Sequence, residues 1–231
     1  MSTKRKKNLA IIPARGGSKR LPNKNLSLLG GKPLVSHTIE AAINSDNVTD
    51  VLVSSDSEKI LDIASKYKGV IGHKRDQHLS TDTSTALELV EYIFLNSKKY
   101  DFITLMLPTC PFRTSAHLDD GFSRIEEDDD GVVSLTTVDF PIALIVDIEN
   151  QYINLDENSA LITGNTRSQN HKVKYRPSGG FYISRWDSFN QYRNFWKGNV
   201  KYYIMDILDS VDIDTFEDLK YANLIYNNKV H

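Results

Sequence analysis

The stretch LAIIPARGGSKRLPNKN, residues 9–25, decides the fold because it joins a buried strand to a cationic loop. Residues 9–12 are all apolar, as in a strand covered on both faces, and Pro13 ends the run. The loop contains Gly16 and Gly17 and concentrates four basic side chains within ten positions: Arg15, Lys19, Arg20 and Lys24. A flexible, strongly cationic loop at the end of a strand indicates an anion-binding site.

The glycines let the loop backbone approach a ligand closely, and successive N–H groups in such a turn form an anion-binding concavity. Arg15 can donate a pair of hydrogen bonds to phosphate, and Lys19 and Lys24 add point charges. We therefore interpret the loop as a nucleoside triphosphate site; the alternative is a solvated basic turn. The P-loop pattern GxxxxGK[ST] and the dinucleotide pattern GxGxxG are both absent from the sequence.

Strand-like apolar runs alternate with segments of helical period along the chain. Strands are predicted at residues 9–12, 48–55, 69–72, 101–108, 131–138, 179–184 and 200–206. Helices are predicted at residues 33–45, 56–67 and 80–99, near 114–128, at 186–192 and from about Thr215. This order predicts one α/β domain, residues 1–231, with a Rossmann-like, mostly parallel sheet and helices on both faces. Residues 139–175 break the alternation and are interpreted as an inserted excursion.

The carboxyl ends of the predicted strands locate the expected site, since ligands of such sheets bind there. The opening loop, residues 54–56 and residues 108–111 all lie at these ends. A second constellation, DSVDIDTFEDL at residues 209–219, carries Asp212 and Asp214 on either side of Ile213. This spacing indicates an extended segment with both carboxylates on one face, suited to Mg²⁺ bridging carboxylates and phosphates. Helix capping by Asp214 is the alternative.

Composition limits the class of protein. The 231-residue chain has a net charge of −2 and a single cysteine, Cys110, which suits a reducing compartment. No apolar stretch reaches the roughly 18 residues of a membrane helix. We expect a cytoplasmic protein with no membrane or nucleic-acid partner. The basic run at residues 4–7 is interpreted as a solvated tail; a targeting or nucleic-acid patch is the alternative.

Five motifs in this order strongly resemble the CMP-acylneuraminate (sialic acid) synthetases and their relatives for legionaminic and pseudaminic acids. They are IIPARGGSKRLPNKN (11–25), RDQHLSTDTS (75–84), LMLPTCPFRT (105–114), YRPSGGFYI (175–183) and DSVDIDTFEDL (209–219). The resemblance implies a cytidylyltransferase of the nucleotide-diphospho-sugar transferase fold, whose insertion (139–175) exchanges contacts in a homodimer. The reaction would join CTP to a nine-carbon 2-keto acid sugar and release pyrophosphate.

The resemblance also assigns residues by matching position. The nucleotide side comprises Arg15, Ser18, Lys19 and Lys24 for the triphosphate, Asn25 and Arg75 beside the nucleotide, and the backbone near Ser84 and Ala86 for cytosine. Catalysis would depend on Arg15, Lys24, Asp212 and Asp214, and the last two would bind Mg²⁺. The sugar side comprises Leu107, Arg113, Arg167, Arg176 and Ser178, with Arg167 reaching a partner subunit's site.

Three positions depart from the family pattern, and all are expected on the sugar side. Leu107 stands where the family commonly has glutamine, Ala143 where it often has lysine, and Ser178 where it often has asparagine. Losing an amide and a cation removes hydrogen bonds that a polar sugar would use. A sugar with an apolar methyl end, such as a 9-deoxy legionaminic or pseudaminic acid, is therefore favoured over N-acetylneuraminic acid. A GTP-dependent or Kdo-type enzyme and a non-catalytic nucleotide-binding module remain the alternatives.

The remaining polar and aromatic features are expected to be structural. His73, His78 and His171 stand in polar contexts, so a solvated position is expected for each, and no histidine base is evident. Cys110 is expected to be a small packing residue. The aromatic side chains of residues 189–203 are expected in core or interface packing, with nucleic-acid stacking as the alternative.

Overall fold

The computed structural model describes residues 5–230, and its centre is a seven-stranded sheet in the order β11-β7-β10-β6-β1-β4-β5. Its strands are β1 (Asn8–Pro13), β4 (Asp50–Ser55), β5 (Val70–Lys74), β6 (Phe102–Leu105), β7 (Gly131–Thr137), β10 (Tyr175–Arg185) and β11 (Val200–Ile204). All neighbours pair in parallel except β10, which runs antiparallel to β6 and β7. The expectation of a mostly parallel sheet is confirmed.

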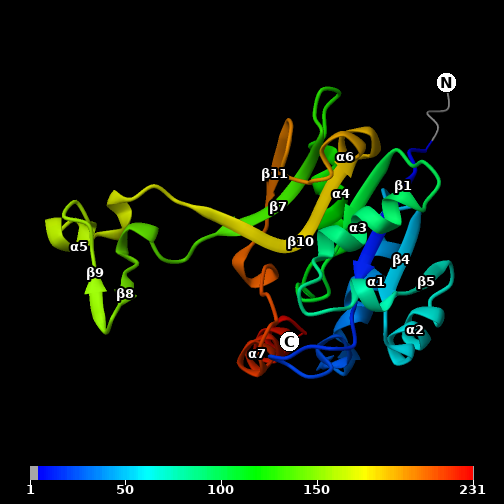
Figure 1. Cartoon of the computed structure of the whole chain (residues 1–231), viewed down its shortest axis with the longest axis horizontal. Helices are drawn as coiled ribbons and strands as arrows, with labels where there is room; N and C mark the ends of the chain where they lie inside the picture. Colours follow the sequence, from blue (N-terminus) through cyan, green and yellow to red (C-terminus); the bar gives the residue numbers. More distant parts are fainter. Residues whose placement is uncertain (1–4, 231) are drawn as a thin grey trace.

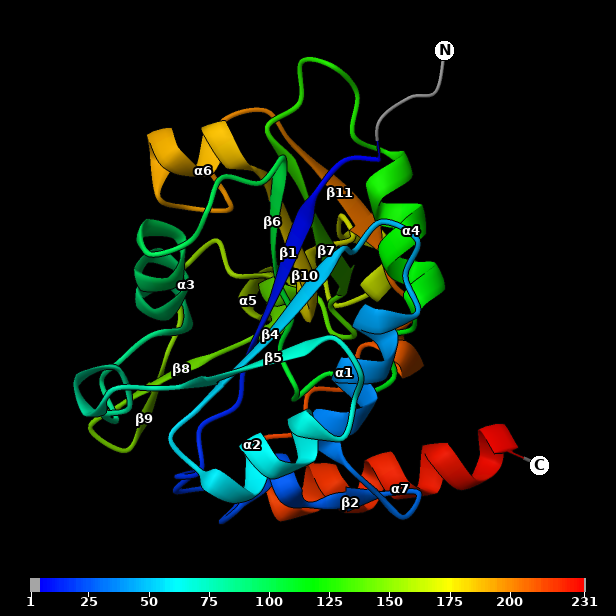
Figure 2. The same cartoon turned by 90° about the vertical axis from the view of Figure 1, so that its right-hand side faces the viewer.

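Helices cover both faces of the sheet, as predicted (Figure 2). One face carries α1 (Leu34–Ile43), α2 (Glu58–Ser65) and α4 (Ser115–Ser123). The other carries α3 (Ala86–Leu95) and α6 (Trp186–Tyr192). The final helix, α7 (Phe216–Val230), packs on the hairpin of β2 (Leu28–Leu29) and β3 (Lys32–Pro33), at the end of the molecule where β1 finishes.

The apolar run that opens β1 serves both cores because successive side chains of a strand point to opposite faces. Ala10 and Ile12 join the core under α1 and α2, whereas Leu9 and Ile11 join the core under α3 and α6. All four side chains are at most 1% exposed. A central strand buried on both faces therefore needs the continuous apolar pattern that the sequence shows.

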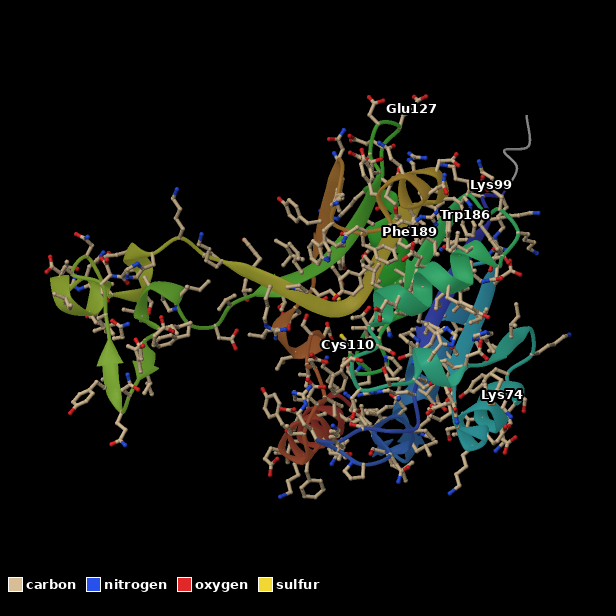
Figure 3. The ribbon with its side chains drawn as sticks, viewed as in Figure 1. Lys74, Lys99, Cys110, Glu127, Trp186 and Phe189 are labelled. Atoms are coloured by element: carbon tan, nitrogen blue, oxygen red, sulfur yellow. The ribbon has the colours of Figure 1, made fainter. Side chains whose placement is uncertain are left out.

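The second core is rich in aromatic rings. Trp186 and Phe189 of α6 lie beside α3 (Figure 3), where Phe94 packs against both rings at centroid distances of 4.3 and 5.2 Å. Phe189 also packs against Phe195 at 5.0 Å. The expected core packing of the aromatic segment 189–203 is thus confirmed for Phe189 and Phe195, while Tyr202 on the edge strand β11 is 56% exposed.

Residues between β7 and β10 form an arm that projects away from the sheet (Figure 1). It contains the short hairpin β8 (Asp147–Glu149) and β9 (Tyr152–Asn154) and the four-residue helix α5 (Ala160–Thr163). The predicted excursion at 139–175 coincides with this arm, although Tyr175 already belongs to β10. Many of the arm's apolar side chains are exposed: Phe140, Ile142, Ile145, Ile148, Tyr152, Ile153, Ile162 and Val173.

Two elements differ most from the sequence-based expectation in where they begin. The strand predicted at 179–184 begins at Tyr175, and its pairing with β7 is shifted between Pro177 and Tyr182, where Gly179 has a φ of +77°. The irregular register hides the strand's period of two from a sequence pattern. The helix predicted at 80–99 begins only at Ala86, because Thr85 and Glu88 form a capping box and the preceding residues form a turn.

None of the helices formed by residues 5–230 has the length and hydrophobicity that crossing a bilayer requires. In the basic run at residues 4–7, residue 4 lies outside the described part of the chain. Arg5, Lys6 and Lys7 are exposed, in keeping with the interpretation as a solvated segment.

Candidate active site

A cleft of about 330 Å³ opens at the carboxyl ends of β1, β5 and β6. Its walls come from segments far apart in the chain: Pro13, Arg15, Lys24, Asn25, Arg75, Ser84, Thr85, Ala86, Leu107, Pro108, Thr109, Asp212 and Asp214. A neighbouring hollow of similar volume shares Arg15, Lys24 and Asn25 and is further lined by Gly17, Ser18, Lys19, Arg20 and Asp82. The structure therefore brings most of the predicted nucleotide-side residues together.

The opening loop is held by its own backbone and by the neighbouring strand. The Ala14 N–H donates to the Ser54 carbonyl at 2.9 Å, which extends the β1–β4 pairing beyond Pro13. The Gly16 N–H donates to Asp56 Oδ1 at 2.7 Å, and a Cβ on Gly16 would lie 2.9 Å from Ser57 Cβ. The Asn25 amide, almost fully buried, donates to the Arg15 carbonyl at 2.8 Å. Asn25 thus fixes the loop as well as lining the cleft.

The acidic pair faces the cationic loop across the cleft. Lys24 Nζ lies 2.7 Å from Asp214 Oδ1, and Arg20 Nη2 lies 2.8 Å from Asp214 Oδ2. The fully buried Ile213 anchors the segment, and its N–H donates to the Thr109 carbonyl at 2.8 Å. The prediction that Asp212 and Asp214 share one face is confirmed, because both line the same cleft.

Asp212 has a pKa above its ordinary value. Burial is the main cause, and the negative charge of Asp214 adds to it, whereas a hydrogen bond from the Thr109 side chain acts in the opposite direction. A buried carboxylate beside a second carboxylate is stabilised by a bound cation. The electrostatics of the pair therefore suit a metal ion.

The donor set fits Mg²⁺ bound together with phosphate. Over the described residues, no cluster of three or more His, Cys, Asp or Glu side chains is arranged to hold a metal ion. Mg²⁺ commonly takes one or two carboxylates and completes its octahedron with waters and substrate phosphates. Asp212 and Asp214 match that smaller set.

A further carboxylate, Asp82, forms ion pairs with two other cations of the loop, Lys19 and Arg15. Lys19 Nζ lies 2.6 Å from Asp82 Oδ2, and Arg15 Nη1 lies 3.5 Å from Asp82 Oδ1. These contacts, led by the Lys19 hydrogen bond, hold the pKa of Asp82 below its ordinary value. In this structure carboxylates thus accept the hydrogen bonds that phosphate oxygens can accept from the same side chains.

The opposite wall of the cleft is formed by Arg75 and the start of α3. Arg75 is 8% exposed, and burial lowers the pKa of its guanidinium to about 10. Residues Ser84 to Ala86 precede and begin α3, and the Thr85 side chain accepts the Glu88 N–H while Glu88 accepts the Thr85 N–H. The capping box holds this turn, so that Ser84, Thr85 and Ala86 line the cleft.

The predicted sugar-side residues are not gathered in one place. Leu107 lines the cleft. Arg176 is exposed at the start of β10, and its positive charge acts to lower the pKa of Asp212. Arg167 is exposed on the arm, next to a short 3-10 helix at Ser168–Asn170. Ala143 also lies on the arm and is exposed.

The sugar-side placement of Arg113 and Ser178 stays a prediction, and in this structure both side chains point into the protein. Arg113 is 2% exposed and donates to the Gly180 carbonyl, the Leu107 carbonyl and the Thr38 hydroxyl. Ser178 is 1% exposed and donates to Ser134 Oγ at 2.7 Å. Arg113 supports the backbone of Leu107 from behind, and Ser178 braces the irregular part of β10.

Four residues that build the site received no individual role from the sequence: Arg20, Asp56, Thr109 and Asp82. Arg20 and Asp82 lie inside recognised motifs, but their pairing with Asp214 and Lys19 depends on folding. Asp56 follows β4 directly, and its position at a strand's carboxyl end was a usable signal. Thr109 holds both the backbone of Ile213 and the side chain of Asp212.

The expectation of a solvated position is wrong for His73. This side chain is half-buried, and its Nδ1 lies 2.9 Å from Ser54 Oγ. Cys110, in contrast, is fully buried as expected for a packing residue, and burial raises the pKa of its thiol to about 11. Figure 3 places Cys110 between the sheet and the segment that leads to α7.

A separate cavity of about 370 Å³ lies between α1 and α7 and is a weaker candidate for the ligand site than the cleft. Three of its charged lining residues are already paired, since Lys229 contacts Asp209 and Glu40 contacts Lys32. The concentration of loop cations beside an acidic pair is found in the cleft at the strand ends.

The family model described as cytidylyltransferase matches residues 9–229, which include every element of this cleft. The chain belongs to the cytidylyltransferase family. It is 33% identical to the pseudaminic acid cytidylyltransferase of Campylobacter jejuni serotype O:2, over 95% of this chain and 96% of that protein. It is 32% identical to the CMP-N,N'-diacetyllegionaminic acid synthase of Legionella pneumophila, over 90% of each.

This cytidylyltransferase is also 33% identical to the N-acylneuraminate cytidylyltransferase of Escherichia coli O18:K1:H7, over 97% of the chain but 53% of that longer protein. A solved structure of CMP:2-keto-3-deoxy-manno-octonic acid synthetase complexed with CTP has a TM-score of 0.68, with 17% identity over 96% of this chain and 99% of that one. The structural likeness shows the shared fold. The expected family and nucleotidyltransferase class of the enzyme are thus confirmed.

Proposed function

We propose that the enzyme joins CTP to a nine-carbon 2-keto acid sugar, giving the CMP-sugar and pyrophosphate. The observation that carries this proposal is the meeting of Lys24 with Asp214, beside Asp212, in one cleft, while Arg20 reaches Asp214 from the neighbouring hollow. Such a cleft can hold a triphosphate and a divalent ion side by side. The relatives with similar sequences carry the names of CMP-sugar synthetases for pseudaminic, legionaminic and N-acylneuraminic acids.

In the proposed reaction the anomeric hydroxyl of the sugar attacks the α-phosphorus of CTP in line, and the bond to pyrophosphate breaks. Catalysis of this kind depends mainly on positioning and charge stabilisation. Arg15 and Lys24 neutralise the charge that develops on the leaving pyrophosphate. Ser18 and Lys19 hold the outer phosphates, and Asn25, Arg75 and the turn at Ser84–Ala86 hold the nucleoside.

Asp212 and Asp214 are the proposed ligands of Mg²⁺. The bound ion would neutralise the α-phosphate and lower the pKa of the attacking hydroxyl. For Asp214 to bind it, the triphosphate must first take over the hydrogen bonds that Lys24 and Arg20 now donate to Asp214. Binding of the nucleotide would thereby free the Asp214 carboxylate to bind the ion.

For the sugar we propose an apolar methyl end, as in a 9-deoxy pseudaminic or legionaminic acid. Leu107 supports this, because it places an apolar side chain on the cleft wall where an amide is common in the family. An amide at this position can hydrogen-bond a hydroxyl, whereas a methyl group packs on leucine without a hydrogen bond.

A homodimer in the cytoplasm is the proposed working form. On the arm, the side chains of Ile148, Tyr152 and Ile153 are 75%, 77% and 65% exposed to solvent. Such exposed apolar surface is unfavourable in water unless another protein surface covers it. Arg167 on the same arm can then reach the site of a second copy and meet the sugar carboxylate. The lone, fully buried thiol of Cys110 suits a reducing compartment.

The test is pyrophosphate release from each of the four nucleoside triphosphates with pseudaminic, legionaminic, N-acetylneuraminic and Kdo acids. We expect turnover with CTP and one of the 9-deoxy sugars. Preference for N-acetylneuraminic acid would overturn the sugar assignment, and preference for GTP or Kdo would establish an alternative enzyme. CTP binding without turnover on any sugar would indicate a non-catalytic module.

A further inference from the structure

His73 lies directly behind a residue of the nucleotide cleft. β4 and β5 pair in parallel with Ser54 opposite His73, and the pairing continues because the Arg75 N–H donates to the Ser55 carbonyl at 2.8 Å. His73 and Arg75 are two residues apart along this strand direction, so their side chains leave the same face. Both therefore converge on the fully buried Ser54.

The contacts form a directed chain of hydrogen bonds. Arg75 donates from Nη2 to the Ser54 carbonyl at 2.8 Å and from Nε to Ser54 Oγ at 3.2 Å. Because a guanidinium only donates, Ser54 Oγ is the acceptor in the second bond. The Ser54 hydroxyl proton is then free to point at His73 Nδ1, 2.9 Å away. Neutral His73, with its proton on Nε2, completes the chain as the terminal acceptor.

We propose that His73 is a positioning residue for nucleotide binding, which acts through the Ser54 hydroxyl to fix the Arg75 guanidinium toward CTP. The inference rests on the proposed function, in which Arg75 contacts the nucleotide. Two bonds on the Nε–Nη2 edge fix the plane of the guanidinium and leave Nη1 for the cleft. Without the His73 acceptor, the Ser54 hydroxyl can rotate, and its lone pairs no longer keep one direction toward Arg75 Nε.

The groups around His73 indicate how pH acts on this chain. Burial lowers the pKa of His73, the Arg75 charge lowers it further, and the Asp76 charge raises it. On the α3 side the Tyr92 ring lies 6.1 Å from the imidazole, and its hydroxyl donates to Asp76 at 3.3 Å. Neutral His73 prevails at pH 7.5. Below its lowered pKa, Nδ1 becomes a donor and the imidazolium repels Arg75.

The experiment measures CTP affinity by calorimetry in the absence of sugar. His73→Leu removes the acceptor and should raise the CTP Kd by about three- to tenfold at pH 7.5. His73→Asn places a carbonyl oxygen where Nδ1 stands and should restore the affinity to within about twofold of the wild type. The matched control is His78→Leu: His78 also faces Tyr92, at 6.1 Å, but is exposed, and its loss should change nothing.

A pH series supplies a second readout, which does not depend on whether His73→Leu folds. The wild-type Kd for CTP should rise more steeply than that of His73→Asn as the pH falls from 7.5 to 5.5, because only the wild type has His73 to protonate. Protonation of CTP itself affects both proteins equally. Equal affinities and equal pH profiles for the wild type and His73→Leu would overturn the inference. Failure of the wild type to bind CTP would instead overturn the proposed function. If His73→Leu does not fold, the wild-type and His73→Asn profiles decide alone.

Discussion

Asp214 joins the two ends of the chain at the cleft, and its loss should separate binding from turnover. Asp214→Asn removes a proposed metal ligand and the charge that pairs with Lys24 and Arg20. We expect turnover to fall by about a hundredfold or more while CTP binding survives. Pyrophosphate release and calorimetry measure the two effects.

The control is Asp209→Asn, because Asp209 pairs with Lys229 outside the cleft. That variant should keep its turnover. Unchanged turnover in Asp214→Asn would remove the metal assignment.

A second prediction at the residue scale concerns Leu107, which determines how polar the wall of the cleft is. Leu107→Gln should shift the ratio of kcat/KM values toward N-acetylneuraminic acid and away from a 9-deoxy sugar by about tenfold. The same exchange at Leu208, which is 43% exposed and outside the cleft lining, should leave the ratio unchanged. Competition assays with both sugars measure it, and an unaltered ratio in Leu107→Gln would refute the assignment.

At the scale of elements, two helices begin with a capping box, but only one of them begins at the cleft. Thr85 caps α3 and Thr114 caps α4, each with a reciprocal capping box. Replacing either threonine with alanine should lower the free energy of unfolding by about 1 kcal/mol, measured by urea denaturation. Only Thr85→Ala should also weaken CTP binding, because only its turn lines the cleft. Equal CTP affinities in the two variants would show that the α3 cap does not shape the site.

At the scale of the whole molecule, the arm is an apolar surface that the domain itself does not cover (Figure 1). Ile148→Asp and Ile153→Asp should raise the dissociation constant of the proposed dimer by at least about tenfold, because burying each side chain contributes on the order of 1.5–3 kcal/mol. Sedimentation equilibrium measures the change. Leu95→Asp on α3, also exposed at 62%, should leave association intact. Arm variants that associate as the wild type does would show that the arm is not the interface.

Local signals account for what sequence reasoning predicted correctly. Residues 9–12 revealed a doubly buried strand, because strand burial appears as a continuous apolar run. The Asp212–Asp214 spacing indicated two carboxylates on one face. Gly16, Gly17 and the surrounding cations indicated a cationic loop at the strand end, and its anion binding stays a prediction. The family motifs then located most of the cleft, including Arg75 and the turn at Ser84–Ala86.

The directions of several side chains were beyond the same reasoning. Arg113 and Ser178 lie in recognised motifs, yet both are buried, because the shifted register of β10 and the packing of residues 105–114 turn them inward. His73 appeared solvated because no local pattern shows that Ser54 lies opposite it.

The sequence by itself determined the α/β class, the strand–loop–cation unit and the acidic pair, since periodicity, turn chemistry and spacing act over a few residues. Only the tertiary structure decided that Lys24 meets Asp214, 190 positions away, and that Arg75, Ser54 and His73 form one chain of hydrogen bonds. Those contacts depend on strand order and register, which arise when the whole sheet packs its two faces at once.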